Sequence, residues 1–173
     1  MAILIGKEKG EKGKMKKFSK ILAITLLVIM LVACFVACKQ NKDELTGSVT
    51  IVLSDPVNNA DTKEYVIDFK GSNLTANSKV CDLLDYVKSL SSDNKNHIDY
   101  TTNNGYMTTI GNLVPEGKSY VALYTSIEKD KDVSEWAMPS KTYNNVTVYY
   151  SGVGINDMTL EAGAVYYFEL TTY

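Results

Sequence analysis

The segment VCDLLDYVKSL, residues 80–90, decides the fold class of this chain. Five aliphatic side chains recur at the spacing i, i+3, i+4, i+7 and i+10, which places them on one face of a helix. They are Val80, Leu83, Leu84, Val87 and Leu90. We expect Asn77 or Ser78 to cap the first turn by accepting backbone N–H bonds. No other stretch after residue 47 is as strongly helical, so the sequence predicts a single helix there.

Runs of β-branched and aromatic residues flank this helix on both sides. Residues 48–54 and 64–70 precede it, separated by a turn-rich segment, and they indicate a hairpin. Further strands are expected at residues 98–102, 106–110, 119–126, 146–150 and 165–170. The order of hairpin, helix and several strands predicts an α+β fold in which one helix packs on a mixed sheet, a roll of β-grasp type.

The amino-terminal segment has the order of a signal peptide. A Lys-rich stretch, residues 14–20, precedes an apolar run, residues 21–37. The run ends in two aliphatic-x-small-Cys patterns, which resemble the lipobox of bacterial lipoproteins; this resemblance implies that Cys34 or Cys38 is diacylated. Leu31 favours Cys34, whereas the change to polar sequence after Cys38 favours that site. A plain membrane span is the alternative, although 17 residues is shorter than the ~20 that a span needs.

These features divide the chain into three parts. We expect a signal segment at 1–38, a short polar tether at 39–47 and one folded domain at 48–173. Met15 resembles the usual start of such a signal more closely than Met1 does. The predicted location is the extracellular face of a bacterial cell membrane, with the protein held by its lipid anchor.

Charge and composition argue against several classes of function. The chain has 18 Lys and no Arg, so it cannot form the bidentate Arg clamps that bind phosphate and carboxylate groups. Residues 39–173 hold 11 Lys and 18 acidic residues, a balance of 11 − 18 = −7, which argues against nucleic-acid binding. His97 is the only His and Cys81 the only Cys after Cys38, so neither a metal centre nor a disulfide is expected. We therefore predict a non-enzymatic protein without a cofactor.

Four segments in order resemble a bacterial surface domain similar to the carboxyl-terminal β-domain of transcobalamin. They are SKVCDLL at 78–84, GYMTTIG at 105–111, YVALYTS at 120–126 and the closing hairpin at 152–168. The resemblance covers about residues 48–173 and implies a β-grasp-like fold. In transcobalamin the equivalent domain covers one face of cobalamin, so the resemblance implies a corrinoid or a similar flat molecule as ligand.

Tyrosines supply the candidate binding surface. All 12 lie after residue 64, and at strand spacing most are expected to cover a sheet face. We take Tyr106, Tyr120, Tyr124 and the loop around Trp136 as the candidate ligand contacts. Packing of Trp136 on the sheet is the favoured interpretation, and an exposed anchor for a partner is the other. The alternative function is a structural or adhesion module that binds an envelope protein or a glycan.

Two loop motifs resemble ligand-binding loops but are not expected to bind a ligand. Asp130-Lys131-Asp132 resembles the opening of a calcium loop, but Glu135 and Lys141 stand where Gly and Glu are required, so we expect a solvated charged loop. Gly152-Val153-Gly154 lacks the third Gly and the following helix of a phosphate loop, and it is expected to be a turn.

Overall fold

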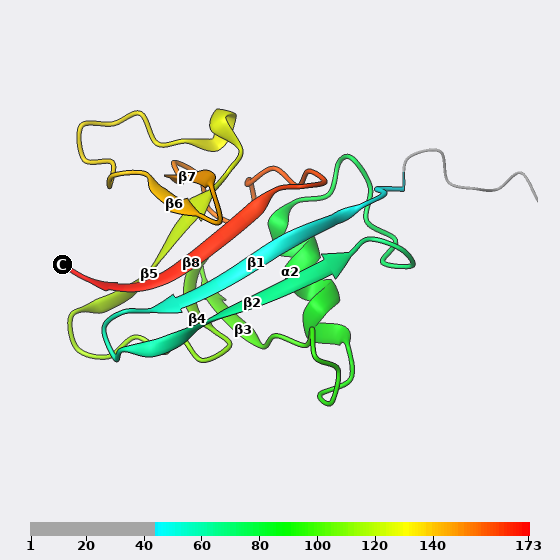
Figure 1. The fold of residues 1–173 in the computed structure, drawn as a ribbon, viewed down its shortest axis with the longest axis horizontal. Coiled ribbons are helices and arrows are strands. Elements are labelled where there is room, and N and C mark those ends of the chain that lie inside the picture. Colours follow the sequence, from blue (N-terminus) through cyan, green and yellow to red (C-terminus); the bar gives the residue numbers. More distant parts are fainter. Residues whose placement is uncertain (1–43) are drawn as a thin grey trace, which may run out of the picture. The chain divides into compact units, whose positions relative to one another are not determined.

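The computed structural model of this chain describes residues 44–173 (Figure 1). The predictions for the signal segment, the acylated Cys34 or Cys38, the start at Met15 and the first part of the tether lie outside the described residues. The end of the predicted tether belongs to the fold, because Leu45 N–H donates to Leu74 C=O (2.8 Å) and Phe69 N–H donates to Gly47 C=O (2.9 Å). Residues 44–173 belong to one compact unit, and we expect this segment to fold on its own.

The described residues form an α+β fold dominated by a six-stranded mixed sheet. Its strands in chain order are β1 (Ser48–Asp55), β2 (Ala60–Asp68), β5 (Ser119–Thr125), β6 (Lys141–Tyr143), β7 (Val146–Tyr150) and β8 (Val165–Thr172). A separate hairpin consists of β3 (Tyr100–Asn103) and β4 (Tyr106–Ile110). The α-helix is α2 (Val80–Ser89), and a short 3-10 turn, η1 (Glu128–Asp130), follows β5.

The first and last strands lie side by side in the middle of the sheet. The spatial order is β2-β1-β8-β5-β7-β6, and β1 and β8 pair in parallel from Thr50–Val165 to Ser54–Glu169. All the other neighbours in the sheet pair antiparallel. The expected strands are confirmed, with small changes at their ends. β6 was not predicted, because three residues are too few to show an alternating pattern.

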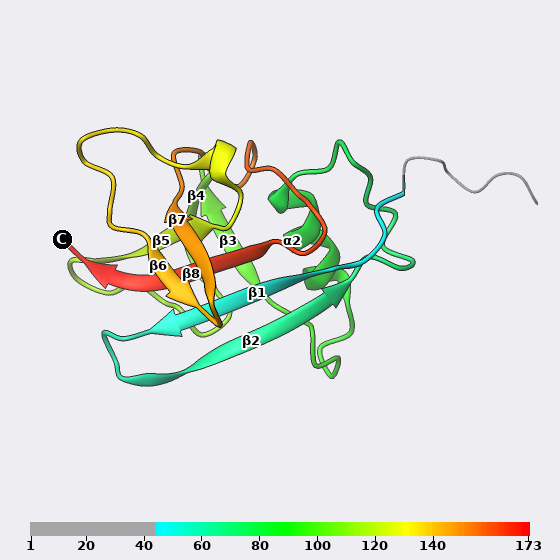
Figure 2. The same cartoon turned by 45° about the horizontal axis from the view of Figure 1, so that its top comes forward.

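The helix covers one face of this sheet (Figures 1 and 2). Four members of its aliphatic stripe, Val80, Leu83, Leu84 and Val87, are fully buried as predicted. The fifth, Leu90, follows the last helical residue and is half-buried. The four buried side chains share a core with side chains of the sheet that face them, among them Ile51, Ile67 and Phe168. The β3–β4 hairpin adds Met107 and Ile110 to the same core. Truncation of one of these fully buried aliphatic side chains to Ala costs ~2–5 kcal/mol of stability.

The start of the helix differs from the prediction. Lys79, rather than Asn77 or Ser78, is the cap residue, and its N–H donates to the Asp82 carboxylate at 2.7 Å. Carbonyl groups of a distant loop accept the next two N–H groups: Val80 N–H donates to Met158 C=O (3.2 Å) and Cys81 N–H to Ile155 C=O (3.1 Å). The free N–H groups of the first turn are therefore satisfied by tertiary contacts, which local sequence does not indicate.

The opposite face of the sheet is covered by two of its own strands, β6 and β7. The β6–β7 hairpin crosses over β8, as Figure 2 shows, and encloses a second core around Val52, Tyr124 and Val148. Within this core Lys141 Nζ donates to both carboxylate oxygens of Glu169 at 2.8 Å. Because Glu169 is buried, this ion pair keeps a charge satisfied inside the aromatic layer.

A polar clasp joins the two outer strands of the curled sheet. Tyr143 of β6 donates its hydroxyl to Glu64 Oε2 of β2 at 2.5 Å, and Asn144 Nδ2 donates to the same oxygen at 3.4 Å. The hydrogen bond to Glu64 raises the pKa of Tyr143 to about 12. The clasp therefore requires a protonated Tyr143.

This clasp predicts a dependence of stability on alkaline pH. The pKa of Tyr143 in the folded chain lies above the ordinary tyrosine value of 10.0, so its contribution to stability is present below pH 10 and is lost as pH rises towards 12. Y143F should lose less stability than the wild-type chain over that interval. The difference should stay under about 1 kcal/mol, because the contact is largely exposed.

Urea unfolding at several pH values between 9 and about 12 measures this difference. Y173F is the matched control, since Tyr173 is 82% exposed at the carboxyl end. Parallel loss of stability in the wild type, Y143F and Y173F would contradict the clasp.

Candidate ligand-binding site

A pocket of about 560 Å³ opens where the β3–β4 hairpin meets β5 and the loop that follows β7. Its floor is apolar and includes Met107, Val121, Leu123 and Val153. Its walls carry Tyr106, Tyr120 and Tyr150, which come from three different strands. Pockets of 300–1,000 Å³ that combine an apolar lining with a few polar groups are typical small-molecule sites.

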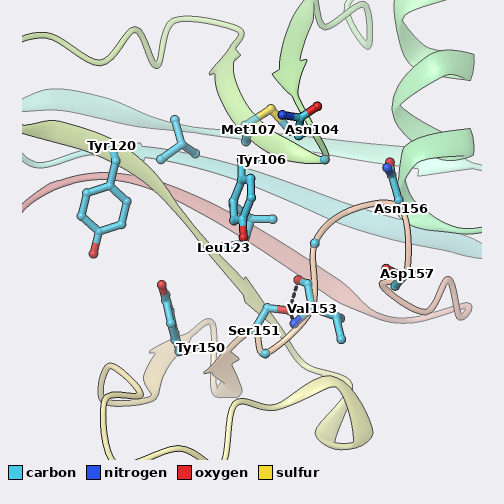
Figure 3. A pocket seen from close by; sticks show the side chains of 14 residues that line it. Asn104, Tyr106, Met107, Tyr120, Leu123, Tyr150, Ser151, Val153, Asn156 and Asp157 are labelled. Atoms are coloured by element: carbon cyan, nitrogen blue, oxygen red, sulfur yellow. Dashed lines mark hydrogen bonds between the residues drawn. The ribbon is translucent and has the colours of Figure 1, made fainter.

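The three tyrosines are arranged differently (Figure 3). Tyr106 stands at the base of the hairpin turn and is 78% exposed. Tyr120 and Tyr150 face the pocket from β5 and β7, with their hydroxyl groups pointing towards each other. Tyr120 donates to Met138 Sδ at 3.3 Å, and burial raises the pKa of Tyr150. Burial therefore favours the neutral phenol form of Tyr150.

Two tight loops fix the shape of one side. The β3–β4 turn places Asn104 and Gly105 at positive φ, 51° and 81°, the geometry expected from the Asn-Gly pair. Gly154 packs directly on this turn, since a Cβ added to Gly154 would lie 3.1 Å from Gly105 C=O. Gly152-Val153-Gly154 is a turn, as predicted, and it also forms part of the pocket wall.

The sheet leaves part of the β5 backbone open towards this pocket. β7 pairs with β5 only at Tyr124 and Thr125, and Ser151 N–H then donates to Leu123 C=O at 2.8 Å. Along an antiparallel strand alternate residues direct N–H and C=O to the same side, so Val121 also points its backbone groups away from β8. Within residues 44–173 no strand pairs with Val121 on the side of β5 away from β8, and Val121 lines the pocket there.

Polar side chains stand opposite the tyrosine wall. Asn104, Asn156 and Asp157 line the pocket, and Figure 3 places Asn156 and Asp157 across from Tyr120 and Tyr150. The Ser151 hydroxyl, in contrast, is engaged with its own loop, because it donates to Val153 C=O at 2.8 Å and accepts from Val153 N–H. Asp157 is the one acidic residue among the lining residues, and none of them is a Lys or His.

Only two of the four ligand contacts that were proposed from the sequence line the pocket. Tyr106 and Tyr120 line the pocket. Tyr124 is 1% exposed in the second core, where its ring packs edge-on against Tyr150 and Tyr167. Trp136 lies in the loop between η1 and β6 and does not line the pocket. Its side chain is 82% exposed, so the expected packing of Trp136 on the sheet is wrong.

Sequence reasoning missed the other contributors. Tyr150, Asn156 and Asp157 lie 44 to 51 residues after Tyr106, and only the tertiary approach of the two loops brings them together. The Asn-Gly turn and the Gly-Val-Gly segment were recognised as turns. The glycines of these two segments were the one sequence signal that other backbone segments approach them closely.

The expected solvated loop at 130–132 needs a correction. Asp130 is 8% exposed, and its carboxylate accepts bonds from Thr159 N–H (2.6 Å) and from Thr159 Oγ1 (3.0 Å). Asp130 thereby holds the segment that runs from the pocket wall to β8. Its carboxylate is a structural anchor, which explains its burial.

Cys81 is a free, half-buried thiol near the helix start. Burial and then the nearby Asp82 carboxylate raise its pKa, so the thiol form is favoured. Across residues 44–173, no group of three or more His, Cys, Asp or Glu side chains could hold a metal ion. The helices of this described part include none long and apolar enough to span a membrane.

No protein-family model matches this sequence, and a search of curated proteins finds no match.

Proposed function

We propose that this chain is a lipid-anchored bacterial surface protein whose folded domain binds a small molecule in the tyrosine-lined pocket without catalysing a reaction. The observation that carries the proposal is the pocket itself. Three tyrosine rings, an apolar floor and a few polar side chains converge on about 560 Å³. The Ser151 hydroxyl is hydrogen-bonded within its loop, and Asp157 is a single carboxylate, so the lining groups suit binding more than chemistry.

The sheet topology supports a β-grasp fold for the domain. A hairpin leads into a helix, and the last strand returns to pair in parallel with the first in the middle of a mixed sheet. The helix packs across one face of that sheet. This arrangement agrees with the resemblance to the transcobalamin β-domain. The proposal of a corrinoid ligand is based on that resemblance.

The anchor is proposed from the sequence alone. Two lipobox-like cysteines follow the apolar run, and a diacylated Cys would hold the protein stably because two acyl chains are enough. The described fold begins at residue 44, six residues after Cys38. A domain tethered in this way would stay close to the outer face of the membrane.

An adhesion or structural role is the second candidate, and a specific observation favours it. Val133 and Trp136 are 90% and 82% exposed on the same loop. Exposed Trp side chains are common anchors of protein interfaces. This loop lies outside the pocket lining, so the two candidate functions use different surfaces and can be tested separately.

Calorimetric titration of residues 44–173 with cobinamide and cobalamin tests the ligand proposal. We expect saturable one-to-one binding that weakens about tenfold or more in Y106A, because an exposed aromatic ring that contacts ligand is removed. W136A is the matched control, since Trp136 is equally exposed but does not line the pocket. If W136A lost affinity for the corrinoid and Y106A kept it, the binding site would be the loop around Trp136 rather than the pocket.

Metabolic labelling with a clickable palmitate analogue tests the anchor. The full chain should take up label in bacterial cells, and the double variant C34S/C38S should lose it. We expect C34S to lose more label than C38S, because Leu31 completes the commoner form of the lipobox. Full labelling of the double variant would contradict a lipidated Cys, and an unlabelled wild-type chain would favour the plain membrane span.

A further inference from the structure

The electrostatics of the pocket limit the charge of its ligand. The chain contains no Arg, and none of the residues that line the pocket is a Lys or His. Asp157 therefore acts on the ligand without a compensating cation in the lining. An anionic group would meet a like charge there, which disfavours phosphate, sulfate and carboxylate ligands. A neutral molecule meets no such penalty.

The polar groups of the pocket suit hydroxyl groups. The amide of Asn104 or Asn156 both donates and accepts, and so does a hydroxyl; the Asp157 carboxylate accepts from two hydroxyls. All three side chains belong to residues that line the pocket, and Asn156 and Asp157 are exposed to solvent there. The backbone edge of β5 at Val121, which is unpaired on the side away from β8, borders these side chains in the pocket. The pocket thus offers several paired donor and acceptor positions close together.

The aromatic side chains suit a flat C–H surface. Tyr106 is 78% exposed at the mouth, and Tyr120 and Tyr150 stand opposite the polar side chains Asn156 and Asp157 (Figure 3). A pyranose ring has apolar C–H faces and a rim of hydroxyl groups. Its face can stack on a phenol ring while its rim reaches the amides and the carboxylate across the pocket. The combination of rings on one side and hydroxyl-binding groups on the other therefore matches a sugar.

The site is also preformed. The positive φ values of Asn104 and Gly105 fix the turn that carries Tyr106, and Gly154 packs against that turn. A rigid site loses little conformational freedom when a ligand binds, which favours a ligand with many weak polar contacts. The pocket has an open side, so the rest of a longer chain can extend into solvent.

We infer that the tyrosine pocket recognises one or a few rings of an uncharged saccharide. This inference rests on the proposed binding function of the same pocket and names the class of its ligand. Tyr106, Tyr120 and Tyr150 supply the stacking surface, and Asn104, Asn156 and Asp157 bind the hydroxyl groups.

The test uses the full chain in a zwitterionic detergent, because sugar-based detergents would compete. Neutral trisaccharides of glucose, galactose, mannose and N-acetylglucosamine are titrated by calorimetry. The first three are paired with trisaccharides of the corresponding uronic acid. We expect at least one neutral trisaccharide to bind, and its acidic counterpart to bind about fivefold more weakly or worse. D157N should reduce the difference in affinity between the neutral and the acidic trisaccharide, because it removes the carboxylate that repels the acidic one.

Two variants test whether the saccharide binds in the pocket. Y106A and N156A change exposed side chains, so both should fold, and each should raise the Kd of the bound trisaccharide about tenfold. W136A is the control that should leave the Kd unchanged. Saccharide binding that survives Y106A and N156A would overturn the inference, because another surface would then be responsible.

Cobinamide is titrated in parallel to separate the inference from the proposed function. If cobinamide binds in a Tyr106-dependent manner and no neutral saccharide binds at millimolar concentration, the saccharide inference fails and the binding function stands. If neither class binds, both fail. Preference for an acidic trisaccharide over its neutral counterpart would overturn the inference even if the pocket is occupied.

Discussion

The parallel pairing of β1 with β8 is the constraint on which the rest of this structure depends. It joins the first and last strands of the described chain across more than a hundred residues, from Thr50–Val165 to Ser54–Glu169. β1 contributes Ile51 and Leu53 to the helix-side core and Val52 to the opposite core, so both layers meet at this pair. Parallel strands are stable only when both faces are covered, and here α2 and the β6–β7 hairpin provide that cover.

The pocket follows from how the chain reaches β8. The segment between β7 and β8 must return past the start of the helix, where carbonyls of Ile155 and Met158 accept the first free N–H groups of α2. Asp130 holds the same segment through Thr159. The beginning of this segment is pressed against the β3–β4 turn at Gly154 and forms one wall of the pocket. The binding site is therefore a consequence of the same contacts that begin the helix and position the last strand.

The sequence predicted the periodic parts of this structure and missed the tertiary ones. The apolar stripe of residues 80–90 and the alternation of the long strands depend on local spacing, so helix and strands were found. The carbonyl partners of the Val80 and Cys81 N–H groups, the burial of Asp130 and the contribution of Tyr150 to the pocket depend on contacts between distant segments, which no local pattern records. Tyr106 and Tyr120 were identified as candidates because they are aromatic. Tyr124 satisfied the same criterion, but it faces the second core.

Native-state hydrogen exchange tests the central claim most directly. The amides that bond β1 to β8, within Thr50–Ser54 and Val165–Glu169, should exchange only through global unfolding. Their exchange free energies should equal the free energy of unfolding in urea, whereas amides of the β3–β4 and β6–β7 hairpins should open at lower free energy. Faster exchange at the β1–β8 pair than in either hairpin would show that the pair does not organise the fold.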